Sequence, residues 1–102
     1  MAKKTKKPAS VVIFGKTVLV EYKPLYANKE EGDEVLSGKY NVNDRVITMD
    51  DSLEGAKFSH TLFHEMIHAA LDIGGVGEVL DEKTEEAIAK TIENGLGEYF
   101  CL

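Results

Sequence analysis

Apolar residues recur at every third or fourth position between residues 58 and 71, the spacing that gathers side chains on one face of an α-helix. Acidic and hydroxyl residues at positions 50–52 are typical of a helix start, and Gly74-Gly75 ends the apolar pattern. We therefore expect a helix that ends near residue 73. A second helical pattern runs from residue 81 to about residue 94, so the chain predicts two consecutive helices joined by a glycine-rich reversal.

The first half of the chain has the composition of strands. Four segments are rich in β-branched and aromatic residues: residues 11–14, 17–22, 38–41 and 45–49. Gly15-Lys16 can form the two-residue turn of a hairpin, and residues 42–44 can join the second pair of strands. Residues 23–37 have the Pro, Gly and acidic content of a loop. The pattern predicts an α+β fold in which a small antiparallel or mixed sheet of about four strands packs on two helices.

Length and charge limit what this chain can be. With 102 residues and 43% hydrophobic content, we expect one domain over residues 11–102 behind a disordered basic tail at residues 1–10. The net charge of −6 argues against nucleic acid as a specific partner. No apolar run has membrane-spanning length, and the tail lacks the apolar segment of a secretory signal. A single cysteine excludes an intrachain disulfide, which is compatible with the reducing cytoplasm that we expect. We also expect a monomer.

The first helix carries an H-E-x-x-H motif, in which His64 and His68 lie one helical turn apart. Residues four apart share a helix face, so the two imidazoles can reach a single Zn²⁺ ion, one per chain. Glu65 lies about 100° further round the helix and is placed to act on a water molecule at that ion. The spacing predicts a metal site with Glu65 as the general base.

A third protein ligand is expected from the second helix. Glu85 shares a face with Ile88, Ile92 and Leu96, whereas Glu86 falls on the polar side. A carboxylate on an apolar face is costly unless it is paired or bound to a metal, which favours Glu85 over Glu86 as the third ligand. Three protein ligands leave a position for water, whereas a closed structural zinc site needs four ligands and is usually rich in cysteine.

The chain resembles the small zinc-dependent peptidases of the ImmA/IrrE-like and minimal gluzincin type, many of which are encoded by phages and mobile elements. The resemblance is carried by His64-Glu65-Met66-Ile67-His68 and by the order of the segments 11–15, 18–22, 38–40, 45–49, 61–69 and 84–88. It implies a zincin-like fold, hydrolysis of peptide bonds in a peptide or protein substrate, and residence in a host cytoplasm. The family's Glu-x-x-Ala-Asn/Asp signature is degenerate here, since Ile88-Ala89 follows Glu85, and this leaves the choice between Glu85 and Glu86 open.

The resemblance also suggests where a substrate binds. In metallopeptidases of this type the strand before the metal helix commonly lies along the cleft, so residues 45–49 are expected to offer an exposed edge to an extended peptide. The alternative for this strand is core packing of Val46 or Ile47, and both roles can hold together. His60, Tyr40 and Tyr99 are candidate donors to the oxyanion, although His60 can equally be a surface residue. Asp72 is either a solvated carboxylate or an acceptor for the second nitrogen of His68.

The predicted function is zinc-dependent peptide hydrolysis. A general peptidase and a regulatory protease acting on one partner are two forms of this function that differ in substrate alone. The alternative is a catalytically silent or latent zinc-binding adaptor of the same fold. The C-terminal residues 98–102 are expected to pack on the core, and a sharper alternative places them in the cleft with Cys101 near the metal.

Overall fold

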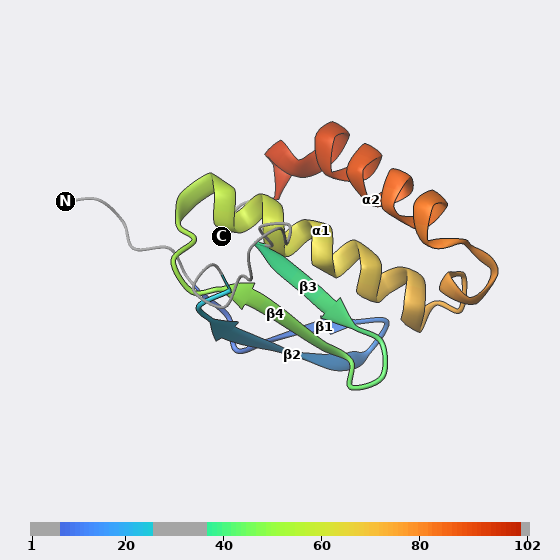
Figure 1. Cartoon of the computed structure of the whole chain (residues 1–102), viewed down its shortest axis with the longest axis horizontal. Helices are drawn as coiled ribbons and strands as arrows, with labels where there is room; N and C mark the ends of the chain where they lie inside the picture. Colours follow the sequence, from blue (N-terminus) through green and yellow to red (C-terminus); the bar gives the residue numbers. More distant parts are fainter. Residues whose placement is uncertain (1–6, 26–36, 101–102) are drawn as a thin grey trace, which may run out of the picture.

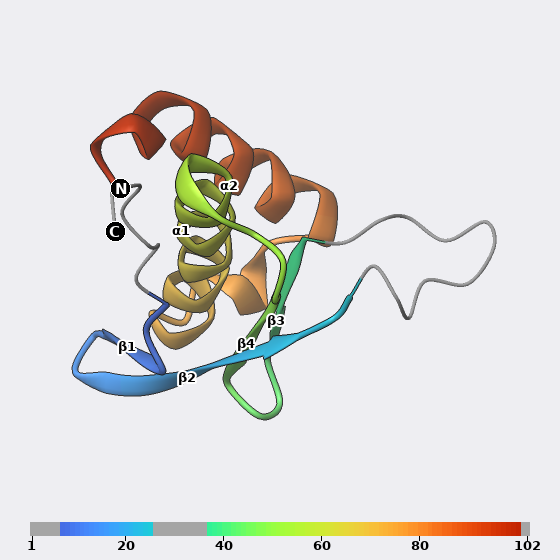
Figure 2. The ribbon, with the colours of Figure 1, turned by 90° about the vertical axis from the view of Figure 1, so that its left-hand side faces the viewer.

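Helix α1 (Gly55–Ile73) lies between a four-stranded sheet and a second helix, α2 (Glu82–Leu96), as Figure 1 and Figure 2 show from two directions. The computed structural model describes residues 7–25 and 37–100. The strands of the sheet are β1 (Ser10–Ile13), β2 (Lys16–Lys23), β3 (Gly38–Asn41) and β4 (Val46–Asp50). Two short 3-10 helices, η1 (Gly77–Val79) and η2 (Gly97–Tyr99), precede and follow α2. The expected α+β class, with four strands and two helices, is confirmed.

The sheet is mixed, with the strand order β1-β2-β4-β3. The two outer pairs are antiparallel, and the central pair, β2 and β4, is parallel. Strand β4 is therefore flanked on both sides, and its residues 47–50 are buried. The prediction that residues 45–49 offer an exposed edge is wrong, because β2 pairs with one side of β4 and β3 with the other. Of the described strands, β3 is the edge strand that contacts α1 most closely.

Both predicted strand pairs form, but their turns differ from the expectation. Ile13 pairs with Lys16, so the hairpin turn consists of Phe14 and Gly15, one residue earlier than predicted. Both turn residues have positive φ, 51° for Phe14 and 75° for Gly15, which gives the twist of a type I′ hairpin turn. Residues 42–45 connect β3 to β4, and β4 begins only after Arg45, whose φ is 53°.

The core lies between the sheet and α1. Its fully buried side chains come from β2, β4 and α1 and include Val18, Ile47, Met49, Phe58 and Leu62. The helical stripe predicted from the sequence is therefore the face of α1 that packs on the sheet. Because this packing fixes α1 against the sheet, it also fixes the direction of the polar face of α1.

Helix α1 begins later than expected. Its first residue is Gly55, and its N-cap, Glu54, makes no side-chain capping hydrogen bond. Asp50 is instead buried at the end of β4, where Oδ1 accepts a hydrogen bond from the Leu25 backbone at 2.9 Å and Oδ2 accepts one from the Ser52 backbone at 3.3 Å. Residues 50–52 therefore form the turn that joins the sheet to α1, with the Asp50 carboxylate bound to the amides of Leu25 and Ser52.

Part of the expected N-terminal tail contacts the domain. The Val20 amide donates to the Ala9 carbonyl at 2.9 Å, and the Lys7 ammonium lies 3.0 Å from the Glu54 carboxylate. Residues 1–6 of the tail, most of the loop 23–37 and Cys101 lie outside the described residues. Among the described residues, no helix is long and apolar enough to cross a membrane.

Candidate metal centre

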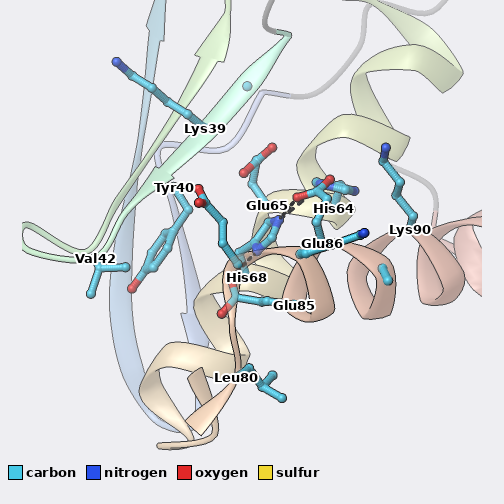
Figure 3. Close-up of a pocket in the computed structure, with 14 residues that line it drawn as sticks. Lys39, Tyr40, Val42, His64, Glu65, His68, Leu80, Glu85, Glu86 and Lys90 are labelled. Atoms are coloured by element: carbon cyan, nitrogen blue, oxygen red, sulfur yellow. Dashed lines mark hydrogen bonds and ion pairs between the residues drawn. The ribbon is translucent and has the colours of Figure 1, made fainter. Parts of the chain in front are cut away.

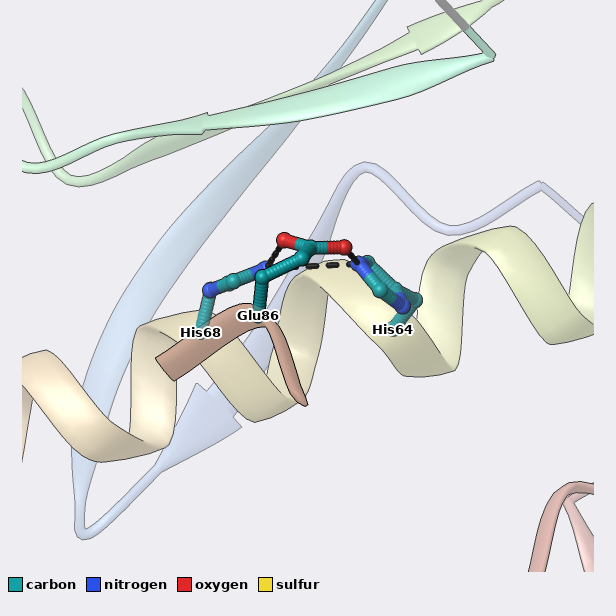
Figure 4. A group of neighbouring side chains, drawn as sticks. All are labelled: His64, His68 and Glu86. Atoms are coloured by element: carbon teal, nitrogen blue, oxygen red, sulfur yellow. Dashed lines mark hydrogen bonds and ion pairs between the residues drawn. The ribbon is translucent and has the colours of Figure 1, made fainter. Parts of the chain in front are cut away.

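Two histidines of α1 and one glutamate of α2 converge on a single point (Figure 4). The Nε2 atoms of His64 and His68 are 3.2 Å apart. The Glu86 carboxylate bridges them, with Oε1 2.9 Å from Nε2 of His64 and Oε2 3.0 Å from Nε2 of His68. Each of the three residues offers one donor atom within 4.8 Å of the others, close enough to hold a metal ion.

These separations suit one small cation. Bonds of about 2.0–2.2 Å to nitrogen and oxygen, arranged tetrahedrally, place neighbouring donor atoms about 3.3 Å apart. The Nε2–Nε2 separation of 3.2 Å lies close to that value, and each Nε2 has one oxygen of Glu86 at 2.9 or 3.0 Å. Two imidazoles and one carboxylate are also a donor set that zinc accepts. The residues present therefore fit a metal ion of this kind.

The second ring nitrogen of each histidine is held by another glutamate of α2. Nδ1 of His68 is 2.6 Å from Oε2 of Glu85, and Nδ1 of His64 is 2.8 Å from Oε1 of Glu93. When each Nδ1 donates its proton to a carboxylate, each Nε2 presents a lone pair. Two lone pairs and the Glu86 carboxylate then face one another, an arrangement that needs either a cation or an extra proton on each ring.

The structure brings Glu86 to the Nε2 atoms and places Glu85, the residue expected there, on the far nitrogen of His68. The reason lies in how α2 packs. Ala89 is the fully buried residue of α2, and the residues on either side of it along the helix face, including Ile88 and Ile92, are half-buried. The face towards α1 is therefore centred on Ala89, and Leu96, the last residue of the predicted stripe, is 54% exposed. That face carries glutamates because it contacts the histidines of α1.

Sequence reasoning missed Glu93 altogether. A signal was present, because Glu86 and Glu93 are seven residues apart and so share one helix face two turns apart. The partners of that face, His64 and His68, also lie on one face of α1. Once Glu86 faces that pair of histidines, the shared helix face places Glu93 towards α1 as well.

Glu65 is a buried carboxylate beside the cluster, with 7% of the residue exposed, and it lines the same cleft as the two histidines. Burial raises the pKa of the Glu65 carboxyl, while the adjacent imidazoles of His64 and His68 act to lower that pKa. Figure 3 shows the Glu65 side chain beside the histidines and facing β3. A buried carboxyl with a raised pKa in a cleft has the character of a proton acceptor and donor.

The cleft has a volume of about 1130 Å³. Strand β3 forms one wall with Gly38, Lys39 and Tyr40, and the first turns of α2 form the other with residues such as Lys83 and Lys90 (Figure 3). The candidate metal centre lies on the wall that α1 and α2 share. The edge strand of the sheet therefore runs along the cleft that contains the cluster.

Two of the candidate oxyanion donors, His60 and Tyr40, contact other residues of the domain. The ring of His60 lies over Gly97, where an added Cβ would come 3.6 Å from Cε1 of the imidazole, so His60 packs against the end of α2. The Tyr40 hydroxyl donates to Oδ2 of Asp72 at 2.6 Å. Asp72 thus accepts a hydrogen bond from Tyr40. The partner of the second ring nitrogen of His68, a role considered for Asp72, is Glu85.

The C-terminal segment packs on α1 as far as it is described. The ring of Phe100 stacks on that of Phe63, with centroids 5.0 Å apart. Tyr99 is 79% exposed and does not line the cleft. The prediction that the tail packs on the core is confirmed for Phe100, and the proposed role of Cys101 falls outside the described residues.

Comparison of the chain with models of known protein families, with curated proteins and with solved structures finds no match. The resemblance to ImmA/IrrE-like and minimal gluzincin peptidases therefore stays a prediction, and function has to be inferred from the geometry of the site.

Proposed function

We propose that this protein is a zinc-dependent peptidase of zincin-like fold, in which His64, His68 and Glu86 hold the ion and Glu65 is the general base. One observation carries the proposal: three metal-ligating side chains converge beside a buried carboxylate inside a large cleft. The resemblance of the H-E-x-x-H segment to small zinc peptidases supports the same reaction class.

The ligand set favours a catalytic site over a structural one. Two histidines and one glutamate occupy three positions of a tetrahedral ion and leave the fourth for a water molecule. The alternative function, a silent zinc-binding adaptor, gives no reason for Glu65. Burial makes the ionised form of Glu65 costly and raises the pKa of its carboxyl. An adaptor would carry this cost without using the carboxylate.

Zinc bound here would supply Lewis acidity, lowering the pKa of a water molecule and polarising the scissile carbonyl. The chain supplies the proton transfers. The Glu65 carboxylate accepts a proton from the attacking water and then donates it to the nitrogen of the departing amine. Its raised pKa suits both steps, because a group that ionises nearer neutral pH can both take up and release a proton.

Strand β3 is a suitable guide for a peptide substrate. Among the described strands it is at an edge of the sheet, and its residues Gly38, Lys39 and Tyr40 line the cleft. An extended peptide can pair with such an edge through backbone hydrogen bonds, which bind many sequences alike. We therefore expect the substrate to be an extended or unfolded segment rather than a folded surface.

The test is cleavage of an unfolded polypeptide by the zinc-loaded protein and by Glu65→Gln, with zinc content measured on both. The parent should bind one zinc per chain and cleave, and Glu65→Gln should keep its zinc while cleavage falls at least about a hundredfold. Glu78→Gln, an exposed glutamate in η1, serves as the control and should match the parent. Cleavage by Glu65→Gln at the parent's rate, or a parent without zinc, would contradict the proposal.

A further inference from the structure

Helix α2 contributes three glutamates to the centre, and only one of them faces the Nε2 atoms. Glu85 and Glu93 each contact the Nδ1 of one histidine, at 2.6 Å from His68 and 2.8 Å from His64. Their side chains are 26% and 24% exposed, against 42% for Glu86. They are therefore held within the interface between α1 and α2 and are not solvated surface charges.

We propose that Glu85 and Glu93 are positioning residues of the metal centre, each holding the Nδ1 of one ligand histidine so that both Nε2 atoms face Glu86. This inference rests on the metal site of the proposed function and extends it to two residues with no direct contact with the ion. A hydrogen bond at Nδ1 selects the tautomer whose Nε2 lone pair is available to a metal, and it stops rotation of the ring. Both effects lower the cost of assembling the site.

The residues around Glu85 restrict the position of its carboxylate. A Cβ placed on Gly77 would lie 3.3 Å from Oε1 of Glu85 and 3.5 Å from the Leu71 carbonyl oxygen. The carboxylate of Glu85 thus lies directly against the backbone at the start of η1, where a side chain at position 77 would crowd it. Helix η1 fills the turn between the two helices and limits where the Glu85 carboxylate can move.

The spacing along α2 gives each glutamate its own partner. Glu86 and Glu93 lie two turns apart on one helix face, whereas Glu85 is about 100° away from Glu86. His64 and His68 are one turn apart on α1, so Glu93 reaches the N-terminal histidine and Glu85 the C-terminal one. The pairing is one glutamate to one ring, which predicts separable effects for the two residues.

The experiment measures the zinc dissociation constant of the full chain by competition with a chelator. We expect Glu85→Ala and Glu93→Ala each to weaken binding tenfold to a hundredfold, the usual effect of removing such a partner. Glu85→Gln and Glu93→Gln should recover part of the loss, because the amide oxygen accepts the same hydrogen bond. Glu82→Ala is the matched control: it lines the same cleft from the same helix but contacts neither histidine in the described structure.

A spectroscopic readout separates positioning from a general loss of stability. At saturating Co²⁺, the visible bands of Glu85→Ala and Glu93→Ala should be shifted or broadened, while those of Glu82→Ala should overlay on the parent's. Circular dichroism at saturating zinc checks that each variant is folded, and the Gln variants, which keep the side-chain volume, cover the case in which an Ala variant unfolds.

The outcomes distinguish this inference from the peptidase proposal. Unchanged affinity in both Ala variants, or an equal loss in Glu82→Ala, would overturn the positioning role and leave the peptidase proposal standing. A parent that binds zinc but cleaves nothing would refute the peptidase while the affinity series still decides on Glu85 and Glu93. A parent that binds no zinc would overturn both.

Discussion

Gly38 of β3 lies directly against Glu65 of α1: a Cβ added to Gly38 would be 3.2 Å from Cγ of Glu65 and 3.0 Å from Cγ2 of Thr61. Contacts this short mean that a side chain at position 38 would have to displace its neighbours. Glycine there lets the edge strand approach the helix that carries the candidate base. The close approach of β3, the proposed substrate strand, to Glu65 therefore depends on the absence of a side chain at position 38.

Gly38→Ala should destabilise the protein by about 1–3 kcal/mol, the usual cost of overpacking, because Thr61, Glu65 and Met49 would all have to move. Urea unfolding measures this, and cleavage should fall as well because β3 is pushed away from Glu65. Gly95→Ala is the control, since its added Cβ meets no atom within 4 Å. It should be neutral, or stabilising by up to about 1 kcal/mol, as expected for alanine in a helix. Equal stability of Gly38→Ala and the parent would refute the close approach.

Glu86→Ala should abolish stoichiometric zinc binding, whereas Glu85→Ala should bind zinc with reduced affinity. The reason is that Glu86 faces both Nε2 atoms, while Glu85 contacts only Nδ1 of His68. Metal analysis after removal of free zinc measures the zinc bound per chain in each variant. The protein concentration should be well above the parent's dissociation constant for zinc. Full zinc content in Glu86→Ala with none in Glu85→Ala would restore the ligand set inferred from the sequence.

Glu65→Gln should stabilise the metal-free protein by an amount that grows with pH. Burial raises the pKa of Glu65 above its ordinary value of 4.5, so the folded state disfavours the ionised carboxyl. Below pH 4.5 the group is protonated in the folded and unfolded states alike, and it adds no penalty. As the pH rises, the unfolded chain ionises first, and the parent loses stability until the pH passes the folded-state pKa. Glutamine carries no such penalty.

Urea unfolding of chelator-treated parent and Glu65→Gln at pH 5, 6 and 7 measures this difference. A constant difference across that range would mean that the carboxyl is not disfavoured by burial. The Glu78→Gln protein provides the control for an exposed glutamate, and its stability relative to the parent should vary little with pH.

Tyr40→Phe should cost about 1 kcal/mol of folding stability, because it removes the hydrogen bond from the Tyr40 hydroxyl to Asp72. Burial and the adjacent Asp72 carboxylate raise the pKa of Tyr40 well above its usual range, so the hydroxyl remains a donor at neutral pH. Tyr99→Phe, at a residue 79% exposed, should leave stability unchanged. If both variants unfold at the same urea concentration as the parent, the Tyr40–Asp72 bond contributes nothing.

Zinc removal should loosen α2 more than α1. The face of α2 towards α1 carries Glu85, Glu86 and Glu93 and has one buried apolar residue, Ala89, so the contacts with His64 and His68 hold much of the interface. A ligand present at a hundred times its dissociation constant stabilises the folded state by about 2.7 kcal/mol. Hydrogen exchange with and without chelator should show faster exchange in α2 amides, and uniform exchange across both helices would contradict this coupling.

The sequence predicted the elements well where their evidence is local. The apolar stripe of α1, its end at Ile73, the two helices and the four strands all follow from periodicity and composition. Two predictions that depend on distant segments were wrong: the edge position of residues 45–49 and the choice of Glu85 over Glu86 at the two Nε2 atoms. The parallel pairing of β2 with β4 joins residues 19–23 to residues 46–50, and it turned the expected edge strand into an internal one. No local pattern reports such a pairing.

The sequence by itself determined that His64 and His68 share a helix face and that Glu65 lies beside them, because the geometry of one helix fixes the relation between residues one and four apart. Only the tertiary structure decided which glutamate faces the two Nε2 atoms. That choice depends on the rotation of α2 about its own axis, which is set by the packing of Ala89 against α1 and by three carboxylates competing for two rings. A change of 100° in that rotation exchanges Glu85 for Glu86, and nothing in the spacing of α2 alone specifies it.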